Sequence, residues 1–247
     1  MPMISRLKST AGFTLTELVI VLVVLGILAS VAIRNIVTTV DDAKYQHTTQ
    51  ELDQLACAIR GNPAVYGSGT GSDFGYVGDV GALPPNLDAL VQNPGSYSTW
   101  KGPYIDKGFQ SGDFKTDGWG TAYTYSDTLL RSTGSGSNID KLFADYPSDL
   151  LTRQVQGYVM DANRSAPGTT YKDSLVILLT HPDGAGGTAI ASVHPDKNGY
   201  FSFSNIAVGN LTLTVIYTPQ TDTMTVPITV YPKRDVKTTV VFPADLF

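Results

Sequence analysis

The residue with the most demanding chemistry in this chain is Glu17, a carboxylate inside a long apolar segment. The segment runs from Phe13 to Ile33 as FTLTELVIVLVVLGILASVAI and contains no other charged residue. As a helix it would be ~31 Å long, enough to cross the apolar core of a bilayer. A carboxylate at that depth costs about 3 kcal/mol on insertion scales. The sequence therefore predicts that something compensates the charge of Glu17.

A free amine at Phe13 would be such a compensating group. If the chain is cut between Gly12 and Phe13, the new amine is a positive charge about one helical turn from Glu17. In a bundle of such helices, Glu17 of one chain can pair with the Phe13 amine of the next, so that a buried charge becomes a paired one. Glu17 would then disfavour the single helix in lipid and favour an assembled filament.

Two simpler interpretations of the N-terminus compete with this one. Residues 1–12 carry Arg6 and Lys8 without an acid, which predicts that they stay in the cytoplasm and that the rest of the chain lies outside it. An ordinary signal peptide would be cut after the apolar run, where residues 29–32 (ASVA) are small. A plain signal anchor would not be cut. Neither interpretation explains Glu17.

The segment GFTLTELVIVLVVLGILASVAI resembles the processing signal of type IV pilins and pseudopilins. Gly12 before the cut, Phe13 after it and Glu17 at the fifth mature position match that signal one by one. The resemblance implies a prepilin peptidase that removes residues 1–12 as a leader and methylates the Phe13 amine. It also implies a subunit that is held in the bacterial inner membrane by residues 13–33 and assembles with other pilins or pseudopilins.

A helix is expected to continue beyond the apolar run as far as Arg60. Residues 34–60 contain no Pro or Gly and carry a broken apolar stripe, and Gly-Asn-Pro at 61–63 ends it. A helix from Phe13 to Arg60 would be ~72 Å long, which fits a pilin-like stalk. Many pilins have a proline after the apolar segment, whereas this chain has Arg34, so no proline kink is expected.

The residues after the stalk predict a small head. Residues 64–80 read as a Gly- and Ser-rich loop without a phosphate-binding spacing. A short helix at 83–91, a turn into a strand at 100–105 and a second strand at 122–126 follow. The succession LPxxLxxLV…WxGPYI…DGWGTAYTY resembles the head of the major pseudopilin of type II secretion, over residues 13–130. Its aromatic residues are expected in the core rather than on a stacking surface; they are Trp100, Tyr104, Trp119, Tyr123 and Tyr125.

In the family that the head resembles, the major pseudopilin often holds calcium in a loop after the strand at 122–126. The equivalent region of this chain is residues 129–150. Asp140, Asp145 and Asp149 are candidate oxygen ligands there. They are widely spaced, however, and Ser-Gly-Ser at 135–137 stands where acids would be needed. We therefore expect no metal and a solvated loop that leads to the next domain.

Residues 155–243 have the pattern of an all-β domain. About seven alternating segments are separated by turns at 183–184, 198–199 and 209–210, which predicts a small β-sandwich. The segment also resembles the carboxypeptidase regulatory-like domain, a transthyretin-like sandwich, which implies a non-catalytic module for packing or recognition. The residues that match its pattern are Gly157, Asp161, Asp196, Gly199, Phe201, Ile206, Gly209, Leu213 and Val215.

The sequence offers no constellation for catalysis or for a cofactor. The stretches HPDG at 181–184 and HPDKNG at 194–199 allow a paired His–Asp metal site, but both read better as hairpin turns. His47 is expected to be an exposed or interfacial helix residue. Cys57, the single cysteine, is expected to be a small apolar residue. With a net charge of −5 and a pI of 5.0, no basic surface for nucleic acid is expected.

These features together predict an α+β protein without enzymatic activity. Its parts are a leader at 1–12, a transmembrane segment at 13–33, a pilin-like stalk helix and head at 34–150, and a β-sandwich at 151–247. The expected role is that of a filament subunit, most like a type II secretion pseudopilin, whose C-terminal domains lie in the periplasm or on an extracellular filament and meet cargo or a surface ligand. Two alternatives remain open: a minor type IV pilus subunit or adhesin, and a membrane-tethered binding module that does not polymerise.

Overall fold

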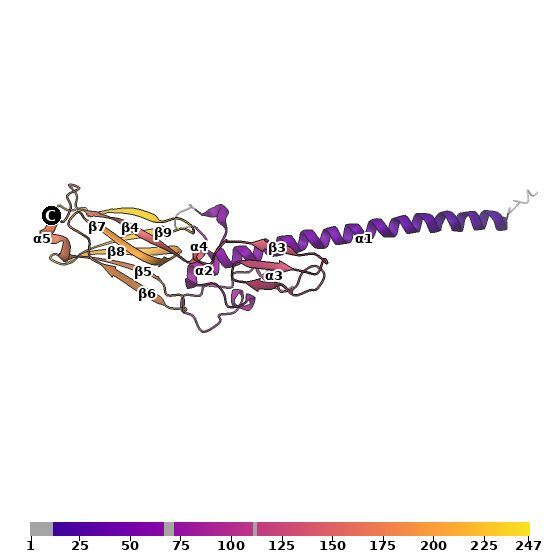
Figure 1. Cartoon of the computed structure of the whole chain (residues 1–247), viewed down its shortest axis with the longest axis horizontal. Coiled ribbons are helices and arrows are strands. Elements are labelled where there is room, and N and C mark those ends of the chain that lie inside the picture. The colour runs from indigo at the N-terminus through magenta and orange to yellow at the C-terminus, as the bar shows by residue number, and fades with distance from the viewer. Residues whose placement is uncertain (1–11, 67–71, 111–112) are drawn as a thin grey trace, which may run out of the picture. The chain divides into compact units, whose positions relative to one another are not determined.

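The structure, a computed structural model, describes residues 12–66, 72–110 and 113–247 (Figure 1). The predicted leader, apart from Gly12, lies outside the described residues. The chain divides into two compact units, residues 1–46 and 47–247. The helix α1 (Leu15–Arg60) begins in the first unit and ends in the second, and its 46 residues confirm the long helix predicted for residues 13–60.

Over the residues that the structure describes, no helix combines the length and the apolar content needed to cross a membrane.

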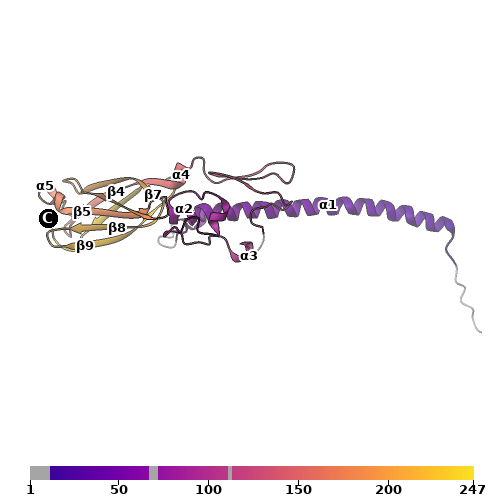
Figure 2. The same ribbon diagram turned by 90° about the horizontal axis from the view of Figure 1, so that it is seen from below.

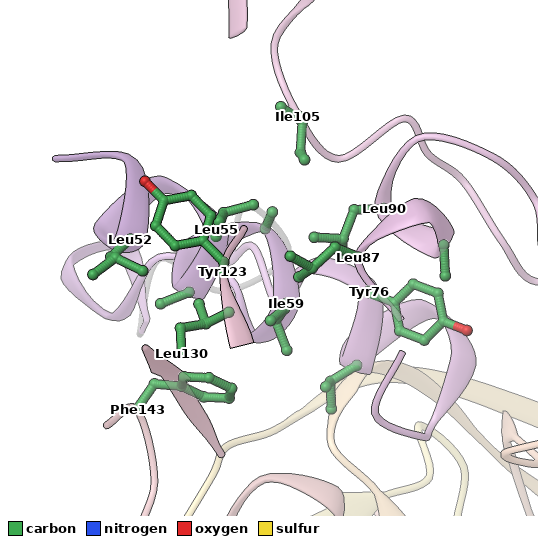
Figure 3. Close-up of a cluster of buried hydrophobic side chains, with 14 of the residues drawn as sticks. Leu52, Leu55, Ile59, Tyr76, Leu87, Leu90, Ile105, Tyr123, Leu130 and Phe143 are labelled. Carbon is green, nitrogen blue, oxygen red and sulfur yellow. The ribbon is translucent and has the colours of Figure 1, made fainter. Parts of the chain in front are cut away.

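The C-terminal part of α1 helps to form the first hydrophobic core of the second unit (Figure 3). Leu52, Leu55 and Ile59 are almost completely buried there, because their spacing puts them on one face of the helix. They pack with side chains from α2 (Gly75–Val80), from the 3₁₀ helix Leu87–Leu90, and from a three-stranded antiparallel sheet. The order of that sheet is β1 (Thr124–Ser126), β2 (Leu129–Ser132) and β3 (Ile139–Leu142).

The prediction of a solvated loop over residues 129–150 is wrong. The segment forms β2, β3 and the short helix α4 (Ser148–Leu151). Leu130 and Ile139 point into the first core and are 0% and 7% exposed. The Gly- and Ser-rich residues 133–138 are therefore the turn of a hairpin rather than a linker.

Two further local predictions differ from the structure. No strand forms at residues 100–105, because this segment is held by the neighbouring 3₁₀ helix instead of by a strand. The indole nitrogen of Trp100 donates to the Ala89 carbonyl at 2.9 Å, and the Tyr104 amide donates to the Leu90 carbonyl at 2.8 Å. The loop expected at 64–80 contains α2, and the helix expected at 83–91 is reduced to Leu87–Leu90.

Seven strands follow α4 in the chain, as the alternation predicted (Figures 1 and 2). One sheet has the order β10-β4-β7 and the other the order β6-β5-β8-β9, and only β10 and β4 run parallel. The buried side chains of both sheets belong to one second hydrophobic core, which includes Val155, Phe201, Ile177 and Leu213. The bounds of the strands are β4 Thr152–Met160, β5 Leu175–Pro182, β6 Thr188–Val193, β7 Tyr200–Ala207, β8 Gly209–Tyr217, β9 Asp222–Val230 and β10 Val236–Val241. Assignment to the transthyretin-like sandwich family stays a prediction.

The C-terminus is packed against the strand-rich part. The helix α5 (Gly168–Tyr171) lies beside it in both views (Figures 1 and 2). The rings of Tyr171 and Phe247 lie 6.1 Å apart, and the Phe247 ring also meets Tyr217 at 5.9 Å. The last residue of the chain therefore has defined neighbours.

The two cores of the second unit are joined by backbone contacts rather than by a free linker. The Gly184 amide donates to the Val80 carbonyl at 3.0 Å, and the Ser98 amide donates to the Gly186 carbonyl at 2.8 Å. Phe74, which precedes α2, is 4% exposed and belongs to the second core. The predicted domain boundary between residues 150 and 151 stays a prediction, since the second compact unit includes both cores.

Candidate functional site

The predicted cleavage position, between Gly12 and Phe13, lies in non-helical chain just before α1. Phe13 is 84% exposed, and among the described residues other than its chain neighbours nothing lies within 4 Å of the position that a Cβ on Gly12 would take. A peptidase needs an accessible backbone at the bond that it cuts. Gly12 and Phe13 are both exposed and lie outside α1, which is compatible with that requirement.

Glu17 is engaged by Thr14 at the start of the helix. The Thr14 amide and hydroxyl both donate to Glu17 Oε2, at 3.0 and 2.8 Å, and the Glu17 amide donates to Thr14 Oγ1 at 3.3 Å. This reciprocal arrangement is a capping box, in which side chains satisfy amides that the first helical turn leaves without partners. Glu17 therefore has hydrogen-bond partners within its own chain.

The sequence carries a signal for this cap in addition to the predicted pairing of Glu17 with an amine. Thr14-Leu15-Thr16-Glu17 fits the pattern Ser/Thr-x-x-Glu/Gln of a capping box. The pairing of Glu17 with the Phe13 amine of a neighbouring chain stays a prediction. In the uncut chain the Phe13 nitrogen is an uncharged amide, so the pair requires cleavage first.

Between Leu18 and Leu28, α1 presents apolar side chains on all sides. Every large apolar side chain that the structure describes between Phe13 and Val40 is at least 46% exposed. A helix that is apolar all round is normally buried by lipid or by other helices. This surface is therefore the part of the first unit that lipid or other helices would cover.

The three candidate calcium ligands are engaged by cationic side chains. Arg131 contacts Asp140 through two hydrogen bonds of 2.6 and 2.7 Å. Lys233 lies 2.8 Å from Asp145 and 3.5 Å from Asp149. Asp140 therefore links the two strands of the hairpin, and Asp145 and Asp149 contact the segment between β9 and β10. Within the described ranges, no group of three or more His, Cys, Asp or Glu side chains is placed to hold a metal ion.

The two His–Pro–Asp stretches form turns, as the simpler interpretation predicted. Asp183 Oδ1 accepts the amides of Ala185 and Gly187, and Asp196 Oδ1 accepts those of Asn198 and Tyr200. The rings of His181 and His194 contact different backbone carbonyls, those of Pro182 at 2.7 Å and Leu175 at 2.6 Å. The aspartates thus cap hairpin turns.

The remaining candidates lie on or near α1. The His47 side chain is 64% exposed and 3.4 Å from Glu51. Cys57 is half-buried, and burial raises the pKa of its thiol although Arg60 acts in the opposite direction. His47 is exposed, as predicted, and Cys57 lies partly buried on α1. Neither has the environment of a reactive group.

Asp117 is a buried carboxylate that the sequence did not single out as a functional residue. Its side-chain oxygens accept hydrogen bonds from the amides of Trp119, Thr121 and Gly134, at 3.0, 2.9 and 3.0 Å, and from the Ser132 hydroxyl at 2.5 Å. Burial acts to raise the pKa of Asp117, but these hydrogen bonds together hold it below its usual value. Asp117 therefore ties the DGWG turn to β2.

Of the five aromatic residues predicted for the core, one lies in it and four are partly buried against it. Tyr123 is 8% exposed and belongs to the first core, and Trp100, Tyr104, Trp119 and Tyr125 pack against it. The Trp100 and Tyr104 rings meet edge to face with centroids 5.6 Å apart. These residues supply packing volume rather than an open stacking surface.

The N-terminal segment matches the prokaryotic N-terminal methylation motif, over residues 7–33. The chain is also 30% identical over 94 residues to the protein described as type II secretion system core protein G of Xanthomonas campestris pv. campestris. That similarity covers 38% of this chain and 56% of the relative, so the chain spans little more than half of the relative's length. The two findings support the pilin and pseudopilin class for this protein.

Proposed function

We propose that this chain is a structural subunit of a pilus-like filament, most like a type II secretion pseudopilin. A prepilin peptidase would cut between Gly12 and Phe13 and methylate the new amine. The methylation motif and the similarity to a type II secretion protein G support this assignment. The exposed, non-helical backbone at Gly12 and Phe13 is compatible with it.

The observation that carries the proposal is the uncovered apolar surface of α1. The described large apolar side chains between Phe13 and Val40 are all substantially exposed. In water such a surface is unfavourable by about 25 cal/mol for each Å². In the proposed cycle, lipid of the bacterial inner membrane covers residues 13–33 first. The same segments of neighbouring subunits cover them after assembly.

The capping box gives Glu17 two successive roles in this cycle. Both hydrogen bonds from Thr14 go to Oε2. Among the described residues, Oε1 of Glu17 accepts no hydrogen bond, so it is available to the cleaved Phe13 amine of a neighbour. In the single chain Glu17 then caps its own helix, and in the filament the same carboxylate also makes an intermolecular ion pair. Its negative charge near the helix N-terminus is favourable in both states.

Two substitutions separate the capping role from the charge role. Glu17→Gln keeps a side chain that can complete a capping box but removes the charge. Thr14→Ala removes the cap but keeps the charge. We expect Glu17→Gln to be processed normally and to lose filament assembly, measured as sheared filaments or crosslinked oligomers in the native host. Thr14→Ala is expected to assemble. Assembly of Glu17→Gln with failure of Thr14→Ala would contradict the intermolecular pair.

The capping box also favours a second candidate, a membrane-tethered binding module that does not polymerise. In such a protein the cap by itself would account for Glu17, since Thr14 satisfies the carboxylate within one chain. Normal function of both Glu17→Gln and Glu17→Ala would support this candidate. A minor type IV pilus subunit shares the assembly step with a pseudopilin, and a deletion of the retraction ATPase in the host distinguishes them.

The strand-rich part, residues 151–247, is proposed to be an accessory β-sandwich of the carboxypeptidase regulatory-like type. Its two sheets and single shared core support this proposal. The backbone contacts that join it to the first core would hold it in a fixed position on the subunit. In that position it would face the periplasm or the outside of the filament and meet cargo or a surface ligand.

A further inference from the structure

A groove of about 330 Å³ lies on the outward face of the β10-β4-β7 sheet. Alternation along each strand separates this face from the core, because Val155 and Val159 of β4 and Phe201 of β7 point inward. The side chains between them therefore face solvent. The groove is lined by Gln156, Gly157, Tyr158, Tyr200, Lys237, Thr238 and Thr239.

The strand register gives the groove a floor and two walls. Gly157 of β4 lies opposite Thr238 of β10, and the backbone of this pair forms the floor. The first wall contains Tyr158 of β4. Tyr158 lies opposite Thr239 on β10 and opposite Tyr200 on β7. The second wall is the Gln156–Lys237 pair.

The aromatic wall is exposed and geometrically fixed. The Tyr158 side chain is 43% exposed, and its ring meets that of Tyr200 with centroids 5.5 Å apart at 60°. The Tyr200 hydroxyl donates to Gln156 Oε1 at 2.9 Å, which ties the aromatic wall to the polar wall. A half-exposed aromatic ring beside hydrogen-bonding groups suits a ligand with one apolar face and a polar edge, as a sugar ring has.

The polar wall has unused donors and one unpaired positive charge. Within the part of the chain that the structure describes, neither Lys237 Nζ nor Gln156 Nε2 has a hydrogen-bond or ion-pair partner. No acidic residue lines the groove. Asp235, two residues before Lys237, accepts the amide of Gln154 at 3.2 Å and lies outside the lining. In a protein of net charge −5, an unpaired lysine inside a groove is complementary to an anionic ligand.

We propose that this groove binds an acidic polysaccharide, with one uronic acid-type sugar seated on it. The sugar ring packs on Tyr158, its hydroxyls accept from Gln156 Nε2 and pair with Thr239, and its carboxylate contacts Lys237. The groove has the volume of a small-ligand site, so the site takes one or two residues of the polymer. Binding needs only the second unit, so this proposal does not depend on filament assembly.

Affinity electrophoresis of the purified full chain tests the proposal with three named polymers: polygalacturonate, alginate and neutral dextran. The chain is kept in a polyoxyethylene detergent, because a sugar-based detergent would compete for the groove. We expect retardation by at least one of the two acidic polymers and not by dextran. Tyr158→Ala and Lys237→Met are each expected to weaken that binding at least tenfold.

Matched controls identify the groove as the source of the effect. Tyr146→Ala removes a tyrosine that is 69% exposed elsewhere, and Lys101→Met makes the same charge change on a 76% exposed lysine. Both controls are expected to bind like the parent chain. Absence of retardation by both acidic polymers overturns the proposal. So does equal weakening by the controls, or binding of dextran that Lys237→Met leaves unchanged.

Discussion

Removal of the Tyr123 hydroxyl should destabilise the first core far more than removal of the Tyr125 hydroxyl. The Tyr123 hydroxyl donates to Glu51 Oε2 at 2.6 Å, and Glu51 is only 8% exposed. Burial, followed by the contact with Glu51, raises the pKa of Tyr123 above its ordinary value, so the hydroxyl keeps its proton. Among the described residues the buried Tyr125 hydroxyl has no hydrogen-bond partner. The two residues thus form a matched pair in one core.

The structure sets the expected magnitude of each change. Tyr123→Phe leaves a buried carboxylate without its shortest hydrogen bond, and bonds to charged groups contribute about 2 kcal/mol. The 64% exposed His47, 3.4 Å from Glu51, cannot replace it, because exposed pairs contribute about 1 kcal/mol or less. Tyr125→Phe removes a polar atom that has no partner, so stability should be unchanged or slightly higher.

Urea titration followed by tryptophan fluorescence measures this difference in the relevant core. Both tryptophans of the chain, Trp100 and Trp119, pack against the first core, so their signal reports its unfolding. With a slope of about 2 kcal/mol per M, Tyr123→Phe should lower the midpoint by about 1 M. Equal shifts for Tyr123→Phe and Tyr125→Phe would refute the reasoning, because they would show that only ring packing matters.

Three further predictions concern other residues of the second unit. Asp117→Asn should destabilise the folded chain by about 2 kcal/mol. Because the pKa of Asp117 is lowered in the folded state, the stability that this carboxylate contributes is present above pH 3.8 and is lost as the pH falls further. Urea titrations from pH 7 to 3 should therefore show a weaker pH dependence of stability in the variant than in the parent chain. Gly186→Ala should lower the urea midpoint more than Gly136→Ala, because both glycines have positive φ but, of the two, only Gly186 would bring a Cβ against another residue, the Tyr97 ring. Equal losses would contradict the close packing of Tyr97 on Gly186. Cys57 should react with iodoacetamide at pH 8 at least ~10-fold more slowly in the folded chain than in urea, and similar rates would contradict its burial.

Long elements were predictable because their signals are local. The stretch from Leu15 to Arg60 contains a single glycine, Gly26, and no proline, so helix is favoured until Gly61. The seven strands of the second core alternate over six to nine residues each and are separated by turn residues. Local propensity and tertiary structure agree there, so the long helix and these strands can be predicted from the sequence.

Short elements were missed where tertiary contacts decide the structure. Strands β2 and β3 have four residues each, too few for alternation to be visible, and the hairpin turn between them has the composition of a linker. The segment around Trp100 reads as strand but is held by hydrogen bonds to the 3₁₀ helix Leu87–Leu90. Neither outcome follows from the neighbouring residues alone.

The candidate site was predictable in part. Gly12, Phe13 and Glu17 are recognisable by their order and spacing, and the Thr14 cap was readable from Thr-x-x-Glu. The groove on the β10-β4-β7 sheet was not readable, because it depends on the parallel register of β10 against β4. A shift of one residue in that register would turn Lys237 away from Gln156.

The most direct test of the pilin assignment is the intact mass and N-terminal sequence of the protein isolated from its native membrane. The account predicts a chain that begins at Phe13 and carries a methyl group on its amine. A chain that still begins at Met1, or one cut after Ala32, would contradict processing at Gly12 and with it the proposed filament subunit.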